Sequence, residues 1–459
     1  MGISLEAGAR TERAASESAG SNARLDALFR PIDPASLAFF RIGFGLLMFW
    51  EVLRYFHYGW IDRYWIDPAV NFGYPGFEWV RPWPGMGMRI HFVVLGILAL
   101  CIAAGCFYRI AAPLFALGFT YAFLLEQTRY LNHFYLIALL SFLLCFVPAH
   151  RAWSIDALRD PALRDGTVAV WGLWLLRAQI TIVYLFGGIA KLNVDWLGGE
   201  PMRMWLAART DTPLIGGSFT EEWVVYLFSY GALFIDLVIP FLLLIRPTRI
   251  AAFAVVVGFH LLNDQLFFIG IFPWMMIVAT LLFFPPDWPR RLLRRARPAH
   301  TRSGRSAPPY AAWVAAALAL YLALQVLIPL RHFLYPGNES WTEEGHRFAW
   351  HMKLRDKSTQ ARFFATDPRT GQTWELDASD FAEEWQFDKI IDRPHLLPPF
   401  ARHVRDVLGR QGYGNLLIHA EIMSSLNGRK SQLLVNPDVN LAAVKSGLPP
   451  NPWILPLKD

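Results

Sequence analysis

The spacing of apolar residues constrains this chain more than any other feature. Apolar runs of roughly 15–23 residues succeed one another as far as Leu330, where the pattern ends. A large soluble core would break into shorter amphipathic stretches, whereas a hydrocarbon layer about 30 Å thick requires apolar helices of roughly 20 residues. Charged residues make up only 17% of the chain, against about 25% in soluble domains. The sequence therefore predicts a polytopic α-helical membrane protein.

About nine transmembrane helices are expected, several of them short enough to be tilted or broken. The predicted spans are residues 38–55, 92–107, 111–125, 134–148, 171–189, 223–245, 250–262, 272–284 and 310–330. Residues 60–83 are rich in Trp and interrupted by Pro and Gly, which is typical of an interfacial loop or short amphipathic helix. We expect residues 1–34 to be a disordered tail and 35–330 to form the membrane domain.

Basic residues predict the orientation. Arginines gather in the N-terminal tail, in alternate short loops and in the dense run at 290–305 before the last span. The positive-inside rule then places the N-terminus in the cytoplasm and the C-terminal part outside the membrane. Because these residues act as topology signals, the net charge of +6 does not indicate a nucleic-acid partner; membrane lipid is the expected surrounding.

Residues 331–459 have a different pattern. Alternating apolar positions predict strands at 347–355, 361–367, 372–378, 415–425 and 431–437, and residues 400–408 predict a short helix that Gly409 ends. We expect a small extracytoplasmic α+β domain, mostly antiparallel sheet. Cys101, Cys106 and Cys145 all lie inside apolar runs, so they predict small core residues and no disulfide framework.

Lys191 directly follows the fifth span. A Lys at a helix end usually extends to the lipid headgroups. The preceding small residues Gly187, Gly188 and Ala190 instead favour close helix packing and leave room for a ligand. If the amine is withdrawn from water, desolvation favours its neutral form, which can act as a general base.

Two further polar pairs lie at the same predicted membrane boundary. Asn132 and His133 begin the fourth span, and His260 and Asn263 end the seventh. A shared pocket with Lys191 is one interpretation, in which Asn and His donors stabilise an oxyanion. The simpler ones are a helix N-cap for the first pair and an interhelical hydrogen bond for the second. No HExxH motif or Gly-rich phosphate loop is present.

Several motifs together resemble one known family. YLFGGIAKLNVDW, YLNHFYLIALLSF, FHLLNDQLFFIGIFPW and PAHRAWSIDAL look like the vitamin K-dependent γ-glutamyl carboxylases and their bacterial HTTM (horizontally transferred transmembrane domain) relatives. In the outer domain, WTEEGHRFAWHM and SLNGRKSQLLVNPDV extend the resemblance in order as well as type. It implies an integral protein of the bacterial inner membrane.

The resemblance implies a reaction without a metal. Lys191 would deprotonate vitamin K hydroquinone, and O₂ would convert it to a strongly basic alkoxide. The alkoxide would remove a γ-proton from a glutamate in a peptide or protein substrate, and the carbanion would add CO₂, giving γ-carboxyglutamate and vitamin K epoxide. Asn132 and His133 would bind the quinone oxyanion and assist proton abstraction. The residues implied in cofactor or glutamate binding are His260, Asn263, Phe267, Ile271, Trp350 and Met352.

Two other functions stay open. A relative of this family can retain quinol epoxidation without carboxylase activity. A non-enzymatic membrane receptor or assembly protein would instead bind a partner through its outer domain and hold only lipid in its pocket.

Overall fold

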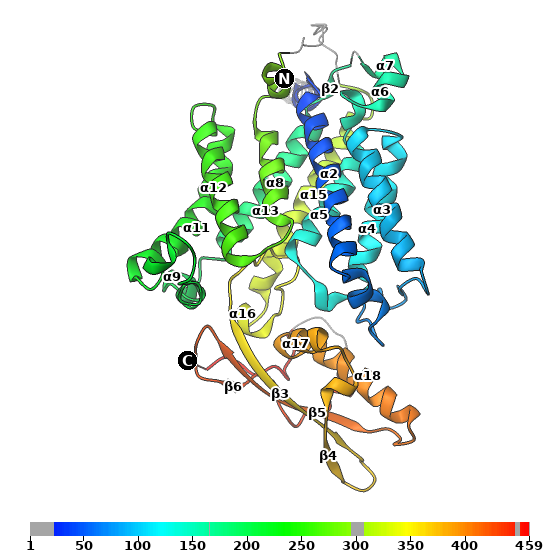
Figure 1. Ribbon diagram of the computed structural model, residues 1–459, viewed down its shortest axis with the longest axis vertical. Helices are drawn as coiled ribbons and strands as arrows, with labels where there is room; N and C mark the ends of the chain where they lie inside the picture. The colour runs from blue at the N-terminus through cyan, green and yellow to red at the C-terminus, as the bar shows by residue number, and fades with distance from the viewer. Residues whose placement is uncertain (1–22, 165, 295–306, 446–449, 459) are drawn as a thin grey trace, which may run out of the picture.

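The computed structural model describes residues 23–164, 166–294, 307–445 and 450–458. Within these ranges apolar helices form a bundle, and a sheet domain lies against one of its ends (Figure 1). The principal bundle helices are α2 (Ala35–His57), α3 (Gly87–Ala104), α4 (Tyr108–Leu124), α5 (Asn132–Phe146), α8 (Trp171–Ile189), α11 (Glu222–Leu244), α12 (Arg249–Phe267), α13 (Phe272–Thr280) and α15 (Ala311–Leu330). The first 22 residues of the predicted tail and most of the basic run at 290–305 lie outside the described residues.

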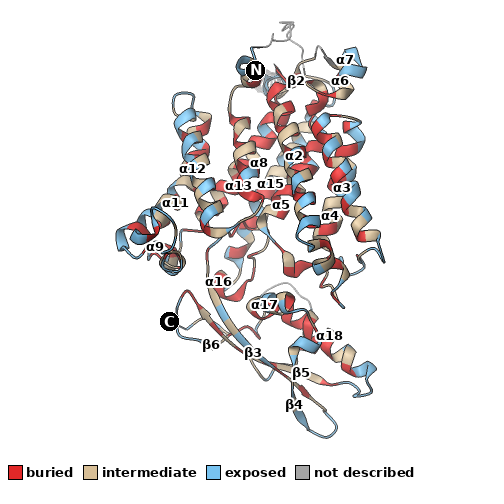
Figure 2. Ribbon diagram, viewed as in Figure 1, coloured by how far each residue is buried: buried red, intermediate tan, exposed pale blue. Residues whose placement is uncertain are grey.

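These helices coincide with the predicted apolar runs to within a few residues. In the described chain, α2, α3, α8, α11, α12 and α15 are the six long and apolar enough to cross a membrane, while α4, α5 and α13 belong to shorter apolar helices. Only 11% of the apolar window of α15 is buried inside the protein. Exposed faces run along the outside of the bundle (Figure 2), and on α3 they carry Ile90, Val93 and Ile97. Outward apolar faces of this kind suit a lipid surrounding, so the chain is a helical membrane protein.

Short elements close both ends of the bundle. Near the described N-terminus, β1 (Pro31–Ile32) pairs antiparallel with β2 (Val168–Ala169), close to α6 (Ile155–Arg159) and α7 (Pro161–Arg164) (Figure 1). The remaining short helices are α9 (Val194–Leu197), α10 (Met202–Ala207), α14 (Trp288–Leu292) and α16 (Glu339–Thr342). In the Trp-rich segment 60–83, a π-helical turn at Asp62–Ile66 is followed by turns and irregular chain, as the sequence predicts.

The outer domain is a four-stranded antiparallel sheet with two helices. The strand order is β4-β3-β5-β6, and β3 pairs with β5 from Lys357↔Leu426 to Thr366↔Leu417. The elements are β3 (Lys357–Thr366), β4 (Thr373–Leu376), α17 (Glu384–Asp392), α18 (Leu397–Arg410), β5 (Leu417–Leu426) and β6 (Gln432–Leu433). Alternate residues of β5 are buried, so one face of the strand joins the core with Phe363 and Phe400. The predicted antiparallel α+β domain is confirmed.

The predicted strand at 347–355 is wrong. This segment forms turns, and Phe348, Trp350 and Lys353 adopt left-handed φ angles of 62°, 61° and 50°. Its apolar side chains meet the bundle and not a neighbouring strand, since the Trp350 ring stacks on Tyr135 with centroids 4.9 Å apart. The alternation of apolar and polar residues in this segment, which is typical of a strand, therefore belongs here to a buried loop.

Polar contacts hold the outer domain to the bundle. On one side, Gln386 Nε2 donates to the buried Glu126 carboxylate at 3.0 Å. On the other, Asp195 accepts hydrogen bonds from Arg429 at 2.5 and 2.8 Å and from Asn427 at 2.7 Å. Burial alone would raise the pKa of Asp195, but the hydrogen bonds from Arg429 and Asn427 outweigh it and hold that pKa below its ordinary value of 3.8.

We expect acid to loosen this second contact. The pKa of Asp195 is lower in the folded protein than its ordinary value of 3.8. The ionised carboxylate therefore stabilises the folded state fully above pH 3.8, and this contribution is lost as the pH falls through the lowered pKa. Asp195→Ala should weaken docking at neutral pH by about 1–3 kcal/mol, since buried donors lose their acceptor. Hydrogen exchange of residues 427–429 would report the change. Asp367→Ala is the matched control, because Asp367 pairs with Arg369 on the sheet and not with the bundle; equal exchange in both variants would contradict the prediction.

Candidate active site

Lys191 is turned into the protein at the end of α8. The residue is only 5% exposed, and its Nζ donates to Asp236 Oδ2 at 2.7 Å and to the Gly187 carbonyl at 3.0 Å. Asp236 lies in the middle of α11 and is also 5% exposed. The headgroup interpretation of Lys191 does not fit this burial. The structure adds what the sequence interpretation lacked, a carboxylate in direct contact with the amine.

Two glycines let α11 approach the lysine. A Cβ at Gly187 would lie 3.2 Å from Met352 Cε and 3.4 Å from Asp236 Oδ2, and one at Gly188 would lie 2.6 Å from Leu237 Cδ2. The expected close helix packing before Lys191 is therefore confirmed. A larger residue at Gly188 would force the Leu237 side chain or α11 itself to shift.

The pair lines an apolar cavity whose empty volume, counted out to its open mouth, is about 580 Å³. Five predicted site residues line it: Lys191, His260, Asn263, Phe267 and Met352. The other lining residues include Asp236, Trp205, Phe272, Met276 and Lys353. Its aromatic and methionine side chains present apolar surface beside the charged pair. The cavity combines a buried amine with an apolar chamber and joins Lys191 to His260 and Asn263, but Asn132 and His133 do not line it.

The two ring nitrogens of His260 differ in their contacts. Its ring nitrogen Nε2 lies 2.9 Å from the hydroxyl of Tyr184 on α8, so the simpler interpretation of an interhelical hydrogen bond is correct. The other nitrogen, Nδ1, is buried and has no partner among the described residues. A buried, unpaired nitrogen is costly unless a ligand contacts it.

Asn132 and His133 line a second, larger cavity between the bundle and the outer domain. This chamber has an empty volume of about 1270 Å³. It shares Ile269, Phe272, Met352 and Lys353 with the Lys191 cavity. The two predicted groups of polar residues therefore lie in adjoining spaces with a common wall.

The N-cap interpretation of Asn132 is wrong. The N-cap residue of α5 is Leu131, and it makes no side-chain cap. The Asn132 amide instead donates to the His351 carbonyl at 2.8 Å and accepts from the Tyr130 hydroxyl at 2.9 Å. It thus ties the start of α5 to the loop that precedes β3.

The second cavity is strongly basic. Six Lys or Arg side chains line it and only two acidic ones, Glu343 and Asp392; the basic residues are Arg347, Lys353, Arg355, Lys357, Lys389 and Arg393. Burial lowers the pKa of Lys357 to about 8 even with Glu343 3.3 Å away. Burial also holds the pKa values of His346 and His395 well below the ordinary value, so both imidazoles are neutral at pH 7. The net positive lining suits an anionic group.

Two predicted residues lie elsewhere. Ile271 and Trp350 are 2% and 0% exposed and belong to the packed bundle core, and neither lines the two cavities described above. The sequence did not predict Asp236 or Lys353 as site residues. A lone carboxylate inside an apolar run was the available signal for Asp236, because such residues are rare and usually paired.

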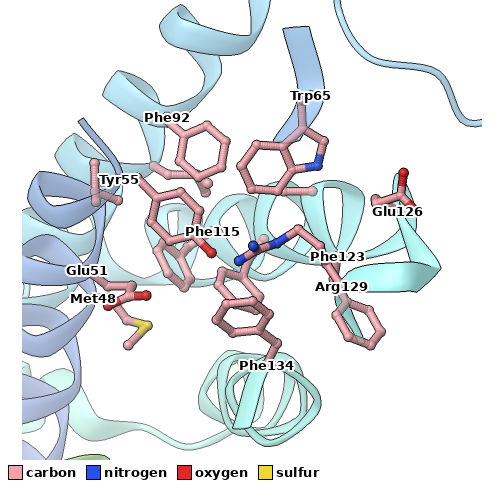
Figure 3. Close-up of a pocket in the computed structure, with 14 residues that line it drawn as sticks. Met48, Glu51, Tyr55, Trp65, Phe92, Phe115, Phe123, Glu126, Arg129 and Phe134 are labelled. Atoms are coloured by element: carbon pink, nitrogen blue, oxygen red, sulfur yellow. The ribbon is translucent and has the colours of Figure 1, made fainter. Parts of the chain in front are cut away.

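A third cavity lies on the far side of α5. About 560 Å³ of empty space is enclosed mainly by aromatic rings, including Tyr55, Trp65, Phe92 and Phe115 (Figure 3). The Arg129 guanidinium points in among them. This cavity contains none of the predicted site residues, so the candidate site remains the pair of adjoining cavities.

The ion pair between Lys191 and Asp236 predicts how single and double substitutions change the free energy of unfolding. Asp236→Asn leaves a buried ammonium without its anion and should lower the free energy of unfolding by about 3–5 kcal/mol. The double variant Lys191→Met/Asp236→Leu should recover most of that loss, because both charges are gone. Thermal unfolding of the purified protein in detergent measures both effects. Asp211→Asn, at an exposed position, is the control; a single variant as stable as this control would show that the pair is not buried.

Two family models match the chain. The HTTM domain matches residues 29–288, and the vitamin K-dependent gamma-carboxylase lumenal domain matches residues 310–459. No solved structure matches it. The matches make this a membrane protein with an extracytoplasmic domain and an enzyme of the carboxylase kind. The chain belongs to the vitamin K-dependent γ-carboxylase family, with an HTTM membrane domain and the lumenal domain of that family.

Proposed function

We propose that this protein carboxylates peptide glutamate to γ-carboxyglutamate in a reaction coupled to epoxidation of vitamin K hydroquinone. One observation carries the proposal: a buried lysine nitrogen lies in an apolar cavity that adjoins a basic chamber. The first space suits a lipid-soluble quinol and the second an anionic peptide side chain. Their shared wall keeps the two substrates close together.

The residues of the Lys191 cavity fit a quinol. Phe267, Phe272 and Met276 offer apolar walls to a flat ring, and the unpaired Nδ1 of His260 offers a hydrogen-bonding partner for a ring oxygen. Bound hydroquinone supplies, with O₂, the strong base that glutamate γ-deprotonation requires before CO₂ is added. The residues of this chain bind the ring, exclude water and move the first proton.

Asp236 gives Lys191 a route to its reactive form. Transfer of one proton from Nζ to Oδ2, along the 2.7 Å contact, converts the ion pair into a neutral amine and a carboxylic acid. The free Nζ lone pair then accepts the hydroxyl proton of the quinol, as a general base.

The basic chamber suits the glutamate-containing substrate. Arg347, Arg355 and Arg393 line it beside the neutral imidazoles of His346 and His395. Their charge attracts a carboxylate, and His133 at the bundle side lies near the wall shared with the quinol cavity. Asn132 positions this wall by holding the His351 carbonyl.

The same proposal includes nine membrane crossings with the N-terminus in the cytoplasm of a bacterial cell. The loop between α11 and α12 lies at the same end of the bundle as the described N-terminus (Figure 1). It contains Arg246, and Arg249 directly follows it as the first residue of α12. That end also carries Arg159 on α6 and Arg290 on α14. A basic end opposite the outer domain agrees with the positive-inside rule.

Purified protein supplied with vitamin K hydroquinone, labelled CO₂ and a Glu-rich peptide tests the reaction. Epoxide together with fixed label supports the proposal. Epoxide alone supports a quinol epoxidase without carboxylase activity, and neither product supports a receptor or assembly protein.

Lys191→Ala should abolish epoxide formation, because the amine proposed to accept the quinol proton is removed and only the less basic Asp236 carboxylate remains beside it. Epoxide is measured by chromatography of the extracted quinones. Lys430→Ala, at an exposed outer-domain position, should leave the rate unchanged. Normal epoxidation by the Lys191 variant would remove this residue from the mechanism.

His133→Ala should reduce carboxylation while the protein still inserts into the membrane. His133 lines the basic chamber, whereas the α5 helix does not depend on its side chain for capping. Fixed label is compared with the amount of protein in the membrane fraction. A variant that loses only expression would assign His133 a purely structural role.

A further inference from the structure

Three possible metal ligands meet where the last bundle helix joins the outer domain. His332 lies in the helical turn Arg331–Leu334 after α15, Glu339 begins α16, and His351 lies in the loop before β3. One donor atom from each side chain lies within 4.8 Å of the other two. None of these side chains has a role in the proposed carboxylation.

No hydrogen bond among the described residues compensates the burial of the His351 ring. It is 2% exposed, and neither ring nitrogen has a hydrogen-bond partner among the described residues. The rings of His332 and His346 pack against it edge to face, with centroids 4.7 and 5.0 Å away. Two unpaired nitrogens in a buried ring are expensive unless something binds them.

His332 is already oriented as a ligand. Its Nδ1 lies 2.7 Å from the Pro329 carbonyl oxygen, which can only accept, so Nδ1 carries the hydrogen. The lone pair is then on Nε2, the nitrogen left for a ligand. Metal-binding histidines commonly donate their other N–H to a carbonyl in this way.

We propose that His332, Glu339 and His351 bind a divalent transition-metal ion, with Zn²⁺ as the best match to two imidazoles and one carboxylate. Imidazole nitrogen bonds Zn²⁺ at about 2.0–2.1 Å, so donor atoms around it lie roughly 3.3 Å apart. Binding would draw the donor atoms, now within 4.8 Å of one another, to that spacing. Three protein ligands leave one coordination position for water.

Such an ion would fix the loop that forms both cavities. The His351 carbonyl accepts the Asn132 hydrogen bond, and Met352 and Lys353 follow directly as part of the shared wall. The left-handed φ angles of Trp350 and Lys353 show that this loop is strained and must be held by its surroundings. The metal joins it to the end of α15.

Zinc binding to the purified full-length protein tests this inference independently of catalysis. After chelator treatment and dialysis against Zn²⁺, elemental analysis should find one zinc ion per chain, and zinc should raise the Tm. His332→Ala and Glu339→Gln should each weaken zinc binding by more than about 100-fold and abolish the rise in Tm. His403→Gln, a histidine of α18, should bind zinc as the unaltered protein does.

X-ray absorption of the zinc-loaded unaltered protein needs no variant. The expected spectrum has two imidazole ligands with oxygen completing the shell. Zinc below one ion per chain, a spectrum without imidazole, or unchanged affinity in folded His332→Ala would overturn the inference. Loss of carboxylation would not, because zinc content is measured separately.

Discussion

The contact between Lys191 and Asp236 sets the geometry of the membrane domain around it. Removing two charges from water costs several kcal/mol per ion, and only close pairing with further hydrogen bonds offsets that penalty. The bundle meets this requirement with a 2.7 Å contact, the Gly187 carbonyl as a second acceptor, and glycines that let α11 come close to α8. The cavity beside the pair is lined by bulky side chains, including Trp205, Phe267 and Phe272.

The same pair links structure to chemistry. A lone buried amine would simply be neutral, but an amine with a carboxylate partner can exchange its proton over a single hydrogen bond. In the proposed mechanism, that arrangement stabilises the lysine in the apolar interior and provides its neutral form when a substrate binds. Lys191 at the end of α8 therefore depends on Asp236 of α11, a residue far away in the sequence.

The two cavities of the candidate site adjoin each other where the bundle meets the outer domain. The loop before β3 contributes Met352 and Lys353 to both cavities, and its backbone is held by Asn132 and by the Tyr130 hydroxyl, which accepts from the Phe348 N–H at 2.7 Å. The outer domain is therefore a structural part of the site. Its basic residues face the bundle from one side, while the lysine and its apolar cavity lie on the other.

Local sequence pattern predicts much of the fold, and each wrong prediction has an identifiable cause. Apolar runs located the helices because each must satisfy its own backbone hydrogen bonds and present apolar side chains to lipid or core. The strand predicted at 347–355 failed because its alternate burial comes from contacts with α5 and not from a neighbouring strand. The helix Glu384–Asp392 was not predicted; few of its residues are apolar, so hydropathy alone did not identify it.

By itself, the sequence determined a membrane bundle with a separate sheet domain, and it identified Lys191, Asn132, His133 and His260 as polar residues in unusual places. Hydropathy and residue type are sufficient for these conclusions because the separation of apolar from polar surface is a local property. Tertiary structure alone decided that Lys191 pairs with Asp236, that Asn132 holds a loop and not a helix end, and that Trp350 belongs to the core. These outcomes depend on which helices approach one another, and side-chain contacts between segments distant in sequence have no local signature.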